Sequence, residues 1–313
     1  MEDCLSGNIR IKKGSFLKNI KRSWQLYVFV SLAFFSILIF SYIPMYGVLM
    51  AFQNFSPAQG IWGSEWVAFH HFEIFFSSPF FLDILRNTLM LSIYALIAGF
   101  PLPIILALAF NEVKDGFFKK FTQTVTYAPH FISIVVMTGM VISFLSPSTG
   151  IINHMLGWIG FEPINFLSSP GWFRSLYVWS GIWQSTGWGT IIYLAALSGV
   201  DPTLQEAAIV DGATRLKRIR YINIPTIMPT IIILLIMNVG AIMTNGFERV
   251  LLLQTPLNLE TSRVISTYVY EVGLIGGRFS FATAVGLFNS VVNAGLLIIV
   301  NMISKKVSDI GLW

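Results

Sequence analysis

The 313-residue chain has little charge and a single cysteine. Asp, Glu, Lys and Arg make up 11% of its residues, whereas a soluble domain usually carries about 25%. Cys4 has no partner for a disulfide within the chain. Hydrophobic residues make up 55%, and the mean hydropathy is +0.70. This composition is typical of an integral membrane protein, and the first apolar run is too long to be the core of a cleavable signal peptide.

The common motifs of catalysis and nucleotide binding are also missing. The sequence has no G-x-x-x-x-G-K-[ST] phosphate loop, no H-E-x-x-H and no G-x-S-x-G. Its four histidines are scattered, and no Asp or Glu lies deep inside an apolar run. Proton-coupled carriers bury acidic or histidine relays, and intramembrane enzymes need a catalytic cluster. We therefore expect no catalytic residues, no metal site and no bound cofactor, and an energy source in a partner protein.

What the chain does have is a series of apolar runs, each long enough to span a membrane, which takes about 20 residues. The third run is interrupted at Pro129-His130. We expect an all-α membrane protein with a polar N-terminal segment at 1–23 and a transmembrane domain at 24–313. The six predicted spans are 24–49, 81–110, 121–145, 173–199, 225–247 and 281–303.

The basic residues predict the orientation. Fifteen of the 20 Lys and Arg residues fall in the N-terminal segment, the second and fourth connections and the C-terminal tail. Cytoplasmic loops are rich in Lys and Arg, so both termini are expected in the cytoplasm. The net charge of +5 is dispersed over short loops, which does not suggest nucleic-acid binding. Five arginines lie elsewhere and could either suit an acidic sugar or pair with Glu248, Glu260 and Glu271: Arg86, Arg174, Arg249, Arg263 and Arg278.

The most informative stretch is the connection at 200–224. Asp201-Pro202 predicts a helix start, with Asp as the N-cap and Pro at the first helical position. Ala207-Ala208 would give that helix a thin face that another surface can approach. Gly212 can adopt a left-handed conformation and end the helix. Pro225 is expected to begin the next apolar helix. On composition alone, the stretch could equally be an ordinary cytoplasmic loop with a solvated run of charge.

The spacing favours a more specific interpretation. Glu206-Ala207-Ala208, Gly212, Ile222 and Ile224-Pro225 resemble the "EAA" loop of ATP-binding-cassette (ABC) importer permeases, although that family usually has Leu before the proline. The resemblance implies a type I ABC importer permease fold and a coupling helix that docks into a cytoplasmic ATPase. The positions that it assigns to this contact are Glu206, Ala207, Ala208, Asp211, Gly212, Ala213, Arg215, Ile222 and Pro225.

Further stretches are similar to the carbohydrate branch of these permeases, which includes alginate-type importers. They are FSYIPMY at 40–46, RNTL at 86–89, GFPLP at 99–103 and YAPHFIS at 127–133. The resemblance implies an oligosaccharide as substrate and a bacterial plasma membrane as location. It also implies a second, similar permease, an ABC ATPase dimer that uses ATP and Mg²⁺, an extracytoplasmic solute-binding protein, and surrounding lipid.

Neutral polar and aromatic side chains within the predicted spans are the candidates for a solute path. Amides in hydrocarbon need hydrogen-bond partners, so bonding from helix to helix is the alternative interpretation. The candidates are Trp179, Trp183, Gln184, Asn238, Asn245, Asn289 and Asn293. A rival hypothesis for the whole chain is a stand-alone secondary carrier of a polar solute, which rests only on the number of spans and their polarity.

Overall fold

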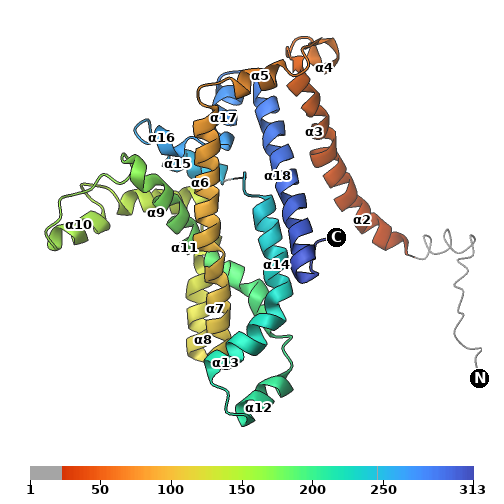
Figure 1. Ribbon diagram of the computed structural model, residues 1–313. Helices are drawn as coiled ribbons and strands as arrows, with labels where there is room; N and C mark the ends of the chain where they lie inside the picture. The colour runs from red at the N-terminus through yellow and green to blue at the C-terminus, as the bar shows by residue number, and fades with distance from the viewer. Residues whose placement is uncertain (1–22, 245) are drawn as a thin grey trace, which may run out of the picture.

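A computed structural model describes residues 23–244 and 246–313. The predicted segment 1–23, except for its last residue, and the candidate Asn245 therefore lie outside the described residues. The described chain is helical apart from one antiparallel hairpin, in which Gln53 pairs with Trp66. Figure 1 shows long helices running between two ends of the molecule, with α12 at the lower end and α4 and α5 at the upper end.

The first rod, Trp24–Phe52, leans away from the other helices in Figure 1, and its most apolar stretch buries no residue. It contains a π-helical turn two residues before Pro44. A proline ring cannot sit against the carbonyl group of the preceding turn, and a wider turn relieves that clash. The elements of this rod are α2 (Trp24–Ile37), η1 (Leu38–Tyr42), α3 (Ile43–Met45) and η2 (Tyr46–Phe52).

A small hairpin and two short helices cover the upper end. His71 is buried, and its Nε2 lies 3.0 Å from the carbonyl oxygen of Gln53, which joins α5 to the hairpin. The connection between the first and second predicted spans is thus an ordered cap. Its elements are β1 (Gln53–Asn54), α4 (Gly60–Gly63), β2 (Glu65–Trp66) and α5 (His70–Phe76).

The second rod runs unbroken from Phe81 to Glu112, and the third predicted span is bent. Its two arms, Phe117–Phe131 and Ile134–Phe144, meet at 101°. The break follows Pro129, and Ser133 caps the second arm by accepting the N–H of Val136. The elements are α6 (Phe81–Gly99), α7 (Pro101–Glu112), α8 (Phe117–Tyr127), η3 (Ala128–Phe131), α9 (Ile134–Phe144) and α10 (Ile151–Trp158).

The fourth predicted span is the 28-residue helix α11 (Pro170–Leu197), which packs against α6, α7 and α14. Four described helices are long and apolar enough to cross a membrane, and the bent pair could supply a fifth. The helix α11 is not among them because its tryptophans, glycines and serines lower its hydropathy. The four are Trp24–Phe52, Phe81–Glu112, Arg215–Gly240 and Phe279–Ser308.

The fifth predicted span differs most from its expected bounds. A continuous helix starts at Arg215 rather than at Pro225 and ends at Gly240 rather than near 247. The proline does not begin a new helix because a π-helical turn two residues ahead of it accommodates its ring. The elements are α12 (Pro202–Val210), α13 (Arg215–Arg218), η4 (Ile219–Asn223) and α14 (Ile224–Gly240).

The last part of the chain returns to the centre. Short helices follow α14, and the long helix α18 then packs against α14 and the first rod. Its burial is greatest near its start, where Phe281 and Val285 join a cluster with Phe75 of α5 and Ile84 of α6. The elements are α15 (Phe247–Leu253), α16 (Leu259–Ser262), α17 (Ile265–Tyr270), η5 (Glu271–Ile275) and α18 (Phe279–Ser308).

Candidate functional site

The short helix α12 projects from the lower end of the molecule and has no buried residue (Figure 1). Its predicted start is confirmed: the Asp201 carboxylate accepts the backbone N–H of Thr203 at 2.9 Å, and Pro202 takes the first helical position. That hydrogen bond holds the pKa of Asp201 below its usual value, because it favours the charged form. The start of α12 is therefore fixed by residues of the connection itself.

The end of α12 is a Schellman turn, and its centre is Gly212. The N–H of Gly212 donates to the carbonyl of Ile209 at 3.0 Å, and the N–H of Ala213 donates to that of Ala208 at 2.9 Å. The φ angle of Gly212 is +72°, which confirms the predicted left-handed conformation. An added Cβ would meet no atom within 4 Å. The glycine is therefore required by backbone conformation and not by lack of space.

The surface that α12 and α13 present is partly apolar. Glu206 and Ala207 are exposed and Ala208 is half-buried. Four large apolar side chains around them are also exposed, up to 86% for Val210. Apolar groups clustered on a projecting helix indicate a surface that binds another protein. The four are Leu204, Ile209, Val210 and Leu216.

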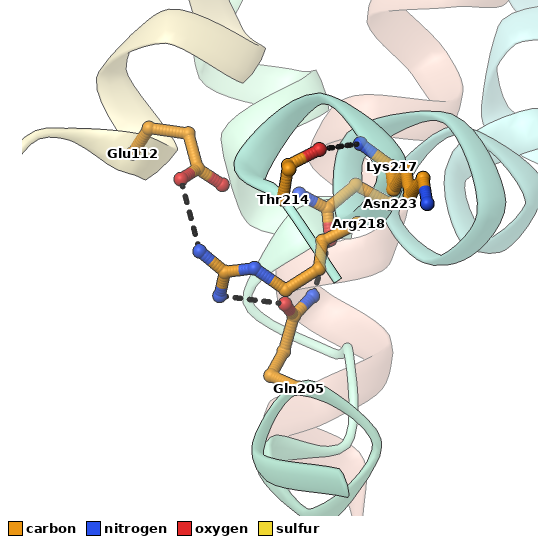
Figure 2. A network of polar contacts seen from close by, with 6 residues as sticks. All are labelled: Glu112, Gln205, Thr214, Lys217, Arg218 and Asn223. Carbon is orange, nitrogen blue, oxygen red and sulfur yellow. Dashed lines mark hydrogen bonds and ion pairs between the residues drawn. The ribbon is translucent and has the colours of Figure 1, made fainter. Parts of the chain in front are cut away.

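Polar contacts fix this projecting unit to the body of the protein (Figure 2). The Arg218 guanidinium lies 3.6 Å from the Glu112 carboxylate at the end of α7 and donates to Gln205 Oε1 of α12 at 3.3 Å. Gln205 in turn donates to the buried Asn223. Thr214 caps α13 by accepting the N–H of Lys217. We call Glu112, Gln205, Arg218 and Asn223 the latch.

The latch was not predicted from the sequence. Glu112 lies near the end of a predicted span, and Arg218 is one of four basic residues between 215 and 220. Their pairing depends on the approach of α7 to α13, which no local pattern encodes. The predicted contacts Asp211, Arg215 and Pro225 are exposed, while Ala213 and Ile222 are half-buried. Ile222 and Pro225 lie in the helix beyond the turn, so the predicted set is not one surface.

Replacing Arg218 with Ala should loosen α12. The change leaves Glu112 and Gln205 without their charged partner, and hydrogen bonds to charged groups contribute about 1.5–3 kcal/mol. We expect amide hydrogen exchange at 202–210 to speed up, measured by mass spectrometry on the purified protein. Lys217→Ala is the matched control, because Lys217 is an exposed neighbour outside the latch. Equal exchange in both variants would contradict a role for the latch.

A second feature is an open cavity of about 520 Å³ lined by residues of α6, α7, α11, α14, α15 and the turn after α14. Of the seven predicted path residues, Asn238 lines it, and its amide donates to the carbonyl of Leu234 on its own helix. Other polar or aromatic side chains on the wall are Ser92, Phe100, Tyr177, Ser185, Trp188, Tyr193, Thr244 and Arg249. A volume of this size suits a small organic ligand.

The other amide candidates mainly join helices. Gln184 is buried, donates to the carbonyl of Ile132 at 2.8 Å and accepts from Arg249. Asn293 accepts the N–H of Met243 and donates to Thr244 Oγ1, each at 3.0 Å. The alternative was bonding from helix to helix. Gln184 bonds in this way to Arg249 of α15, whereas Ile132, Met243 and Thr244 lie in connections between helices.

The remaining candidates lie away from the cavity wall. Trp179 and Trp183 are 53% and 50% exposed, and Trp179 donates to the Tyr94 hydroxyl at 3.0 Å. Both tryptophans are thus on the outside of the described chain. The Oδ1 of Asn289 is buried and has no hydrogen-bond partner among the described residues. The structure thus brings together Asn238 and Arg249, which the sequence named as one of five arginines that could suit an acidic sugar, with side chains that the sequence did not single out.

Known proteins resemble the chain over nearly its full length. The family model for "binding-protein-dependent transport system inner membrane component" matches residues 99–309. Two proteins of Bacillus subtilis (strain 168) are similar. Protein LplB is 44% identical, covering 96% of this chain and 94% of its own. The polygalacturonan/rhamnogalacturonan transport system permease protein YteP is 43% identical, with the same coverage.

Solved structures agree with the sequence relatives. A chain from a bacterial ABC transporter involved in the import of the acidic polysaccharide alginate matches with a TM-score of 0.86 and 45% identity. The match covers 94% of this chain and 99% of that one. A second structure of a bacterial alginate ABC transporter, in complex with an alginate pentasaccharide-bound periplasmic protein, matches equally well. The chain belongs to the family of binding-protein-dependent transport system inner membrane components, and it is a non-enzymatic part of a transporter.

Proposed function

We propose that the chain is a permease subunit of an ATP-driven importer of oligosaccharides and that α12 is its coupling helix. The observation that carries the proposal is the Glu206-Ala207-Ala208 and Gly212 pattern, displayed on a capped, exposed helix at one end of the molecule. Membership of the transport family and its relatives among saccharide permeases support it. This subunit would form half of the translocation pathway.

The proposed topology has six spans with both termini in the cytoplasm. To the four apolar rods we add the bent pair and α11, which is long enough to cross a bilayer at 1.5 Å per residue. Lys and Arg are concentrated near α12, at the start of α8, in α13 and at the end of α18. The positive-inside rule then assigns this end to the cytoplasm of a bacterium.

In the proposed mechanism, two ATPase subunits bind ATP and Mg²⁺ and close on each other. Each holds one coupling helix, so closure moves the coupling helices of this chain and of a second, similar permease together. The pathway between the permeases then opens outward, receives solute from a binding protein and reopens inward after hydrolysis. Exposed apolar groups on α12, such as Val210, support a protein contact at this site.

Cross-linking tests the proposal. In a Cys4→Ser background, Ala207→Cys should form a disulfide with a cysteine in the cleft of the cognate ATPase, and ATP should change its yield. Trp62→Cys is the control, because Trp62 is 89% exposed on α4 at the opposite end. Absence of an ATPase adduct from position 207, or an equal adduct from position 62, would rule the proposal out.

A stand-alone secondary carrier remains the rival. Reconstitution of the chain by itself into liposomes with an ion gradient separates the two. The proposal predicts no solute uptake without the ATPase, and uptake driven by the gradient alone would favour the carrier.

A further inference from the structure

The side chain of Arg249 is the one charged group on the described wall of the central cavity. It comes from α15, and the Tyr177 hydroxyl anchors the start of that helix by accepting the N–H of Gly246 at 3.0 Å. The guanidinium carbon lies 5.7 Å from the centre of the Tyr177 ring. Its Nη2 donates to Gln184 Oε1. Both contacts are on α11, so the arginine spans from one helix to another across the cavity wall.

A glycine makes room for this guanidinium. A Cβ added at Gly181 would overlap Nη1 of Arg249. Gly181 lies about 16 Å along α11 from Pro170, at 1.5 Å per residue. The charge is therefore well inside the length of the helix rather than at its end. A cation at such a depth is costly to keep and usually marks a functional site.

No carboxylate in the described part of the chain balances this charge. Among the described residues, neither Asp nor Glu lines the cavity, and the neighbouring Glu248 is exposed and makes no ion pair. Gln184 supplies the only hydrogen-bond acceptor that the described residues offer to the guanidinium. Arg263, by contrast, has Glu271 at 3.6 Å. Arg249 is thus left with unused donors beside an open space of about 520 Å³.

The rest of the wall suits a sugar ring. Trp188 is 46% exposed, and its ring stacks in parallel on the ring of His130, with centroids 4.5 Å apart. This stacking fixes the orientation of the indole. Asn238 and Ser185 add an amide and a hydroxyl that can bond to sugar hydroxyls. A guanidinium presents its donors in a fork that matches a carboxylate. Aromatic, neutral polar and cationic groups therefore face the same space.

From this geometry, and on the basis of the proposed function, we infer that Arg249 binds the carboxylate of a uronic acid unit as an acidic oligosaccharide passes through the central cavity. The neutral partner Gln184 holds the guanidinium in place without neutralising it. The absence of a side chain at Gly181 leaves space for the guanidinium. The Tyr177 ring lies next to the guanidinium, and its hydroxyl accepts the N–H at the start of α15. Arg249 is then a specificity-determining residue of the pathway.

The test uses the whole importer, with both permeases, the ATPase and the binding protein, in proteoliposomes. The probes are radiolabelled trigalacturonate and its carboxyl-reduced counterpart, galactotriose. We expect Arg249→Gln to lower ATP-driven uptake of trigalacturonate by roughly tenfold or more, since it removes a charged hydrogen-bond donor. ATPase stimulation by the loaded binding protein should persist. Arg249→Lys should restore part of the uptake, because it restores the charge but not the fork.

Two further variants separate the binding role from charge in general. Gly181→Ala keeps the arginine but displaces its guanidinium, so uptake of trigalacturonate should fall. Gly286→Ala is its control, because an added Cβ there meets nothing within 4 Å. Arg263→Gln removes a charge that is already paired with Glu271 and should leave the ratio of the two uptake rates unchanged.

The outcomes distinguish this inference from the proposed function. If the wild-type importer takes up trigalacturonate and Arg249→Gln does so at the same rate, the inference fails while the importer assignment stands. Wild-type uptake of galactotriose alone would also overturn the inference. If the complete importer shows no ATP-dependent uptake of either probe, the inference fails for these sugars, and the cross-linking at position 207 decides whether the importer assignment fails too.

Discussion

Replacing Gly212 with Pro should abolish ATP-driven uptake while leaving the protein in the membrane. Proline fixes φ near −65°, whereas Gly212 has φ +72°, and the change removes the N–H that donates to Ile209. The wrong angle and the lost bond together cost about 3 kcal/mol, or roughly a hundredfold loss of the native turn. The measurement is solute uptake and ATPase activity of the reconstituted complex. We expect ATP hydrolysis without uptake.

Gly212→Asn is the matched comparison. Asparagine tolerates the left-handed conformation and keeps its N–H, and nothing within 4 Å obstructs a side chain at this position. It should retain most of the uptake. If Gly212→Pro transports as well as wild type, the Schellman turn does not serve coupling, and α12 would have to be reassigned as a passive loop.

The second large effect is expected at Gly187, where α11 meets the bent pair of helices. A Cβ at this position would overlap the carbonyl group of Thr126 and lie 3.0 Å from the backbone N of Tyr127. A flexible side chain could adopt another rotamer to avoid the added methyl group, but these backbone atoms cannot. Gly187→Ala should therefore increase the distance between α11 and α8. Overpacking of this kind typically costs about 1–3 kcal/mol, and occasionally more.

The measurement for Gly187→Ala is the yield of monodisperse protein after extraction in detergent, together with its midpoint of thermal unfolding. Gly139→Ala on α9 is the control, since an added Cβ there meets nothing within 4 Å. Alanine is favoured over glycine in a helix by up to about 1 kcal/mol, so the control should be neutral or stabilising. A Gly187→Ala protein as stable as the control would show that α11 and α8 are not in close contact.

Local chemistry made part of this structure predictable. Asp201-Pro202 and Gly212 define both ends of α12, because capping and left-handed φ are set by a few neighbouring residues. Long apolar runs located the first, second and last rods to within a few residues. The resemblance around Glu206 identified the family, which the comparisons confirm.

Features that depend on distant segments were not predictable in the same way. Pro225 taken alone predicts the start of a helix. In the structure, the π-helical turn before it allows a single helix to continue past the proline. Arg249 was grouped with four other arginines outside the basic segments, and its contact with Gln184 joins residues that are 65 positions apart in the sequence. The position of the guanidinium depends on the missing side chain at Gly181. The sequence alone does not show which group packs against that glycine.

The unbroken helix from Arg215 to Gly240 has a mechanical consequence. One end carries the latch arginine Arg218, and Asn238 near the other end lines the cavity, about 30 Å away at 1.5 Å per residue. A continuous helix of this kind can carry a tilt from one end to the other. It has two sites where a helix commonly bends, the π-helical turn Ile219–Asn223 and the internal Pro229. Under the proposed function, the bending stiffness of this helix would determine how much of the movement that the ATPase imposes on α12 reaches the cavity.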